Sequence, residues 1–149
     1  MTKKKYSISI ILPILNEIES LKKTLKIINS INVNKEYIVI YSTKLTDKST
    51  KEKIFDLKKK YKNLKHFPQI KPFVGGAIDI GIAKALKNHI AIMASDLETN
   101  PYELKKMISL SSKNLNSIIS ADRWISQKGF SNYGMIKFLA NFIFQNLLK

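Results

Sequence analysis

The chain alternates between apolar runs with the period of a strand and segments with the period of a helix. Residues from Tyr6 to Leu12 form an apolar run with the length and β-branched composition of a buried strand. Three similar runs follow: EYIVIYS (36–42), LKHF (64–67) and HIAIMAS (89–95). LNSIIS (115–120) predicts a fifth strand.

The segments between these runs predict helices. Asn16 is expected to cap the first helix, and Glu19 to complete a capping box by reaching back to it. One face of that helix then carries the apolar residues Ile18, Leu21, Leu25 and Ile28. Further helices are predicted at 47–62, 75–86, 101–112 and 131–149.

Strands that alternate with helices of this length indicate βαβ units and a mostly parallel sheet with helices on both faces. We therefore predict one α/β domain over residues 1–149. In such sheets, ligands bind where the carboxyl ends of strands meet helix N-termini. Candidate chemistry is thus expected in three loops: PILNE, STKLTD and ASDLETNP.

Charge favours anionic partners. The 149 residues carry a formal net charge of +15, and Arg123 is the only arginine among the cationic residues. Direct reading of bases depends on the planar guanidinium group, so no nucleic-acid partner is expected. The absence of cysteine excludes disulfides and thiolate metal sites and is compatible with the cytoplasm, where we expect the protein.

The N-terminus MTKKKYSISIILPIL has the basic head and apolar middle of a signal peptide. It lacks a small-residue cleavage site, and NEIES follows with the pattern of a helix start. These features favour a first strand. No run approaches the ~20 apolar residues of a membrane-spanning helix.

The stretch IAIMASDLETNP (90–101) places acids at the end of a buried strand, just before the predicted helix at Pro101. Carboxylate oxygens there suit Mg²⁺ or Mn²⁺, which often bind one or two carboxylates together with substrate phosphates. A simpler interpretation is that Asp96 or Thr99 caps the following helix. The stretch alone leaves both interpretations open.

Four stretches in order resemble the family 2 glycosyltransferases, inverting enzymes with the GT-A fold. They are ISIILPILNEIESL (8–21), VGGAIDIGIAKAL (74–86), IAIMASDLETNPYEL (90–104) and SADRW (120–124). Within the family, the chain looks most like the branch of dolichyl-phosphate mannose synthase. The resemblance implies a nucleotide-diphosphate-sugar donor, and it covers the front part of a typical family domain.

Residue by residue, the resemblance implies a donor site. Pro13, Asn16 and Glu17 match the first loop, which lies against the nucleotide in the family. For Asn16, a helix cap is the alternative role. Gly75 and Gly76 match the turn where backbone N–H groups approach the donor, with a plain tight turn as the alternative.

The acidic positions match in part. Asp96 matches the last acid of the family's Asp-x-Asp motif, which meets the metal and the diphosphate, but Ala94 replaces the first acid. Metal binding is then expected from Asp96 with Glu98. In the second loop only Asp47 remains of the acids that grip base and ribose, so the donor base stays open between uridine and guanosine. Arg123 is expected to pair with phosphate, or else with a surface acid.

No general base is identifiable, because in the family it lies further along than residue 149. The chain is therefore expected either to be a piece of a longer enzyme or to form its acceptor side differently. Three rivals to an active transferase are an inactive nucleotide-sugar-binding module, a nucleotidyltransferase and a nucleic-acid binder. A nucleotidyltransferase would carry a Gly-rich loop after the first strand, where PILNE stands.

The tail YGMIKFLANFIFQNLLK predicts a helix with one broad apolar face. That face either packs on the sheet or lies in the surface of an anionic membrane, helped by the lysines. A membrane location would suit a polyprenyl-phosphate acceptor. A glycan acceptor is the alternative.

Overall fold

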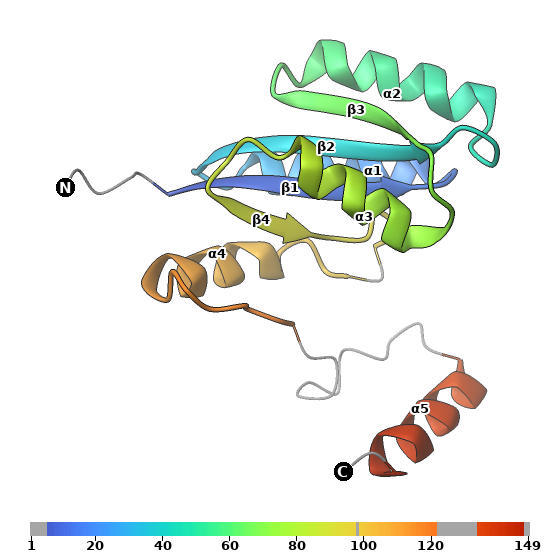
Figure 1. Ribbon diagram of the computed structural model, residues 1–149, viewed down its shortest axis with the longest axis vertical. Helices are drawn as coiled ribbons and strands as arrows, with labels where there is room; N and C mark the ends of the chain where they lie inside the picture. Colours follow the sequence, from blue (N-terminus) through green and yellow to red (C-terminus); the bar gives the residue numbers. More distant parts are fainter. Residues whose placement is uncertain (1–5, 98, 122–133, 148–149) are drawn as a thin grey trace.

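The computed structural model describes residues 6–97, 99–121 and 134–147. Strands and helices alternate along most of this length, as Figure 1 shows. In chain order they are β1 (Ser7–Ile14), α1 (Ile18–Asn29), β2 (Asn34–Ser42), α2 (Lys48–Lys60), β3 (Leu64–Gln69), α3 (Phe73–Lys84), β4 (His89–Ile92), α4 (Glu103–Lys113) and α5 (Met135–Leu147).

The strands form one sheet in the order β3-β2-β1-β4, and every pairing between them is parallel. In the register of this sheet, Ile10 of β1 lies between Tyr37 of β2 and Ala91 of β4. The predicted α/β fold with a mostly parallel sheet is confirmed. Since parallel strands end at the same edge, the loops that follow β1, β2 and β4 meet there.

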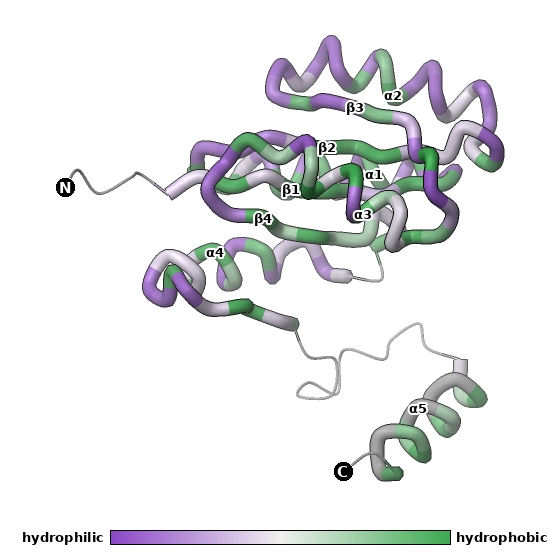
Figure 2. Tube along the Cα trace, in the orientation of Figure 1, coloured by the Kyte–Doolittle hydropathy of each residue, from purple (hydrophilic) through white to green (hydrophobic). Residues whose placement is uncertain are grey.

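Helices cover both faces of the sheet, as predicted (Figure 1). Alternate β1 residues face α1, α2 and α4, whose buried side chains include Leu25, Ile54 and Leu104. The opposite face packs on α3 through Ile11 and Ala77. Figure 2 shows hydrophobic residues concentrated along β1 and β2 and hydrophilic residues along α2. The two faces of β1 are thus buried by different helices, which explains its nearly unbroken apolar sequence.

Helix α3 lies unusually close to β1. A Cβ atom at Gly81 would stand 2.4 Å from Cγ2 of Ile11, which is closer than side chains approach in proteins. Glycine at this position lets the helix pack directly against the strand. This close contact holds the C-terminal half of α3 against β1.

A buried polar cluster stands at the other end of the strands. Glu36 is 4% exposed, and its carboxylate accepts hydrogen bonds from Ser9 Oγ at 2.6 Å, Leu86 N at 2.7 Å and Lys65 Nζ at 2.9 Å. Burial raises the pKa of Glu36, but these hydrogen bonds outweigh burial and leave it below its usual value of 4.5. The carboxylate therefore ties three strands' amino ends to the segment between α3 and β4.

The capping box predicted at the start of α1 is wrong. Glu17, not Asn16, occupies the N-cap position, and no side chain caps the helix there. Glu19 instead pairs with Lys22 one turn later, with 2.8 Å between Oε1 and Nζ. The side chain of Asn16 is engaged elsewhere, by backbone groups of the loop between β2 and α2.

The fifth strand predicted at residues 115–120 is also wrong. This segment contains a turn and irregular backbone, and Ile118 is 98% exposed. A short apolar run becomes a strand only where a neighbouring strand pairs with it and a helix covers it. Within the described residues, β4 pairs with β1 alone, so the run has no such neighbour.

Helix α5 confirms the helical part of the predicted tail over Met135–Leu147. The large apolar side chains that the structure describes in this helix are exposed, from 50% at Phe142 to 86% at Met135 and Ile136. Of the two alternatives left open by the sequence, packing on the sheet is not seen for these side chains, because a packed helix would bury them. Within the ranges that the structure describes, no helix is long and apolar enough to span a membrane.

Candidate functional site

The ends of β1 and β4 are joined side by side at the carboxyl edge of the sheet. Past the last residue of β4, Met93 N donates to Ile11 O at 3.0 Å. Two residues later, the buried Ser95 donates from Oγ to Pro13 O at 2.6 Å. These bonds hold the segment that carries Asp96 against the end of β1.

A cavity of about 310 Å³ opens at this junction. It brings together three residues expected from the sequence in the donor site: Pro13, Glu17 and Asp96. Its remaining lining comes from the N-terminal end of α3 and from the end of β4: Val74, Ile92, Met93, Ala94 and Ser95. The lining thus combines apolar side chains with two carboxylates, as expected of a small-molecule site.

Glu17 is fixed by the loop that it belongs to. Its Oε2 atom accepts from Leu15 N at 3.0 Å and Asn16 N at 3.1 Å. These bonds use one carboxylate oxygen and tie the side chain to the turn between β1 and α1. The carboxylate is exposed, so its second oxygen is open to a ligand hydroxyl.

Asn16 and Asp47 meet beside the cavity rather than in its lining. Asn16 Oδ1 accepts from Asp47 N at 2.9 Å, and Asn16 Nδ2 donates to Leu45 O at 3.4 Å. Asn16 therefore couples the loops after β1 and β2. Sequence reasoning missed this bridge, since residues 31 positions apart give no local signal.

Asp47 serves as the N-cap of α2. Its Oδ1 atom accepts from Thr50 N at 2.6 Å. That hydrogen bond holds the pKa of Asp47 below its usual 3.8. The structure gives this carboxylate a helix-capping contact.

The two adjacent glycines differ in their surroundings. Both lie in the first turn of α3, directly after Val74. A Cβ at Gly75 would meet no atom within 4 Å, whereas one at Gly76 would stand 2.5 Å from Lys71 O. Gly76 is thus required by the fold, whereas Gly75 has open space beside it and follows the lining residue Val74. Both glycines lie inside helix α3, and neither has a positive φ, so they do not form the plain tight turn that was the alternative.

Two left-handed residues flank the cavity and were missed in the sequence. Phe73 has a φ of 63° and Leu97 a φ of 68°, and each is the immediate neighbour of a lining residue. A non-glycine residue in this conformation costs about 1–3 kcal/mol and persists where its surroundings impose it. Such strain often marks binding sites. The sequence gives no signal for it, because both residues are large and apolar.

The donor atoms available for a metal are few. Among the described residues, no group of three His, Asp or Glu side chains could hold an ion together. Glu98, expected to share the metal, and Arg123, expected to pair with phosphate, lie outside the described residues. Asp96 is exposed at the cavity, and one carboxylate with phosphates and water is a common ligand set for Mg²⁺. Asp96 would therefore supply one carboxylate to a divalent ion whose other ligands are phosphate and water.

The comparisons with known proteins bear on this site directly. No curated protein matches the chain. A family model described as "Glycosyl transferase family 2" matches residues 9–148, from within β1 to beyond α5. That match includes the loops at the carboxyl edge and the whole lining of the cavity. The chain therefore belongs to glycosyl transferase family 2.

Proposed function

We propose that the protein transfers a sugar, with inversion, from a nucleotide-diphosphate donor held in the cavity beside Asp96. The observation that supports this most is the meeting of Pro13, Glu17 and Asp96 around one cavity at the carboxyl ends of β1 and β4. Ligands of parallel α/β sheets bind at this edge. Membership of a glycosyltransferase family supplies the class of ligand.

In this proposal each residue has a distinct task. Glu17 accepts a hydrogen bond from a ribose hydroxyl through its open oxygen, and the backbone at Gly75 lies against the diphosphate. Asp96 binds Mg²⁺ or Mn²⁺, which when present offsets the negative charge of the departing nucleoside diphosphate. Ser95 keeps Asp96 in place through its bond to Pro13 O.

The acceptor in this proposal is a polyprenyl phosphate, with a glycan as the alternative. A phosphate oxygen is already anionic and needs no general base to attack the sugar. The exposed apolar side chains of α5 are suited to the surface of an anionic membrane, where such lipids lie. We therefore place the protein on the inner face of a membrane as a peripheral protein.

Calorimetry with UDP-sugars and GDP-sugars, with and without Mn²⁺, tests the proposal. We expect one donor class to bind, more tightly with Mn²⁺, and to be turned over when a polyprenyl phosphate is added. Binding without transfer to any acceptor would indicate a nucleotide-sugar-binding module without turnover. Failure of both donor classes to bind would refute the proposed site.

The two glycines of α3 provide a sharper test of where the donor lies. Gly75→Ala is expected to leave the melting temperature unchanged or slightly raised, because the new methyl group meets open space and alanine favours the helix. It should nevertheless weaken donor binding about tenfold, a loss of ~1.4 kcal/mol, by holding the diphosphate away from the backbone. Titration calorimetry and thermal unfolding measure the two effects.

Gly76→Ala is the matched control. Its methyl group would stand 2.5 Å from Lys71 O, so this variant should lose stability by about 1–3 kcal/mol. Unaltered donor affinity in Gly75→Ala would contradict an approach of the diphosphate to this turn.

A further inference from the structure

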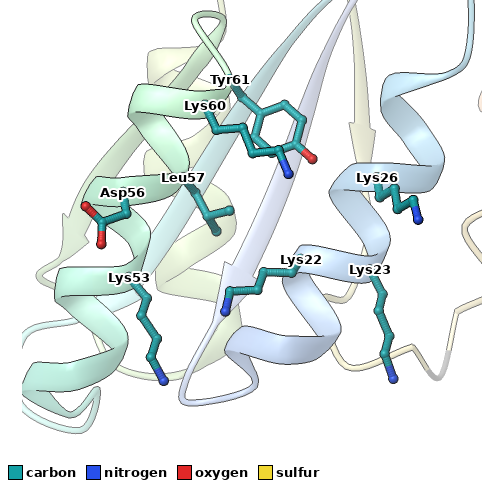
Figure 3. Close-up of a pocket in the computed structure, with 8 residues that line it drawn as sticks. All are labelled: Lys22, Lys23, Lys26, Lys53, Asp56, Leu57, Lys60 and Tyr61. Carbon is teal, nitrogen blue, oxygen red and sulfur yellow. The ribbon is translucent and has the colours of Figure 1, made fainter.

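Helices α1 and α2 enclose a groove that belongs to a different part of the molecule from the cavity at Asp96. Its volume is about 400 Å³, and no residue lines both places. Figure 3 shows its lining: Lys22, Lys23, Lys26, Lys53, Asp56, Leu57, Lys60 and Tyr61. In this view, Lys22 from α1 and Lys60 from α2 extend toward the space between the helices.

The positive charge of the groove exceeds its negative charge, although the carboxylate of Glu19 interacts with the charges of Lys22, Lys53 and Lys23. Its one acid, Asp56, pairs outside the lining with Lys59, with 2.8 Å between Oδ1 and Nζ. Figure 3 shows the carboxylate of Asp56 pointing away from the space between the helices. Lys22 pairs with Glu19. Within the described part of the chain, the other four lysines of the lining form no ion pair: Lys23, Lys26, Lys53 and Lys60.

The floor of the groove and a hollow next to it are suited to holding a ligand. Leu57 and Tyr61 are at most 8% exposed, so the floor between the helices is closed and apolar. A second hollow of about 420 Å³ shares Lys26, Lys60 and Tyr61 and adds Lys62, with amide side chains at its rim. The cationic surface therefore continues along the helix pair instead of ending at one point.

We propose that this groove between α1 and α2 binds a ligand that carries several phosphate groups close together. Like charges gathered on two facing helices repel one another, and a polyanion relieves this repulsion at several lysines at once. Ammonium groups on flexible stems bind phosphates as point charges and need no fixed orientation. A ligand with one charge would leave most of these lysines uncompensated.

Inorganic tripolyphosphate is the direct probe, measured by titration calorimetry on the whole chain at low salt. The variant K26Q/K53Q/K60Q removes three exposed charges, two of them from α2 and one from α1. Its affinity for tripolyphosphate should fall about tenfold or more, and binding to the native chain should weaken as salt is raised.

The control K105Q/K106Q/K113Q removes three exposed lysines of α4 and so lowers the net charge equally. It should change the affinity less than about twofold, because net charge alone acts weakly at a distance in salt. Equal losses in the two triple variants would overturn the proposal, as would the absence of tripolyphosphate binding to the native chain. Circular dichroism checks that both variants keep their helices.

Vesicles distinguish the two sources of clustered phosphate. If vesicles of phosphatidylglycerol bind, vesicles of phosphatidylcholine do not, and tripolyphosphate competes, the groove recognises lipid headgroups. If tripolyphosphate binds and neither vesicle does, the ligand is a free polyphosphate. Binding of an RNA oligonucleotide that K26Q/K53Q/K60Q abolishes, with no binding of tripolyphosphate, would replace the proposal with a nucleic-acid surface.

Discussion

Replacing Asp96 with asparagine is expected to lower the affinity for the nucleotide-sugar donor about 100-fold when Mn²⁺ is present. The carboxylate is the acidic ligand that the cavity offers at the end of β4. An amide keeps the shape of the side chain but removes the charge that a hard divalent ion requires, and loss of such ligands or their partners costs about 10- to 100-fold or more. Titration calorimetry with and without Mn²⁺ measures the change.

The dependence of this affinity loss on Mn²⁺ shows whether Asp96 acts through the ion. Without Mn²⁺ the two proteins should differ much less, because the lost interaction runs through the ion. Asp56→Asn is the matched control, since it removes one carboxylate from α2, away from the cavity lining, and should leave donor affinity within about twofold. An Asp96→Asn variant that keeps native affinity for every UDP-sugar and GDP-sugar would remove the basis of the proposed donor site.

The sequence predicted the fold well where local period and burial agree. The stripe of Ile18, Leu21, Leu25 and Ile28 is buried in α1 as expected. Strand β1 and the Lys-rich α2 also lie where their patterns place them. The strand prediction at residues 115–120 was wrong because three apolar residues among Ser and Asn are compatible with both a strand and irregular backbone. Pairing with a neighbouring strand determines which of the two forms.

The candidate site could be predicted as a set of loops but not as a set of contacts. Parallel strands force the ends of β1 and β4 together, so Glu17 and Asp96 reach one cavity from distant positions in the chain. The bond from Ser95 to Pro13, 82 residues apart, leaves no trace in local sequence. Asn16 is a residue type that often caps helices. Here its side-chain amide instead accepts a hydrogen bond from Asp47 N and donates one to Leu45 O, both in another loop.

The carboxylates at the two ends of the sheet differ in their exposure and in their hydrogen bonding. Exposed carboxylates stand at the carboxyl edge, where a ligand can reach them. At the amino end, Glu36 is buried and fully engaged by the protein itself. In the sequence, Glu36, Glu17 and Asp96 are all acids in or next to a strand. Only the structure shows that Glu36 is buried and hydrogen-bonded, whereas Glu17 and Asp96 are exposed.

Glu36→Ala is therefore expected to lower the free energy of unfolding by about 2–3 kcal/mol without acting on the donor cavity directly. The change leaves the buried Ser9 hydroxyl and the Leu86 N–H without their carboxylate partner. Lys65 loses its ion pair but is 40% exposed and can turn to water, which keeps the loss below that of a fully buried pair. Urea unfolding followed by circular dichroism measures the difference.

The pH dependence of that difference identifies the charge as its cause. The pKa of Glu36 is lower in the folded protein than the usual 4.5 because its hydrogen bonds outweigh burial, so its charged form stabilises the fold. This contribution is complete above pH 4.5 and is lost as the pH falls through the lower folded pKa. The native chain and Glu36→Ala should thus converge in stability below that range. Glu52→Ala, an exposed acid of α2, should shift stability by no more than about 0.5 kcal/mol at any of these pH values. A gap between native and Glu36→Ala that stays constant down to the lowest pH would show that packing, not the ionised carboxylate, holds this end of the sheet.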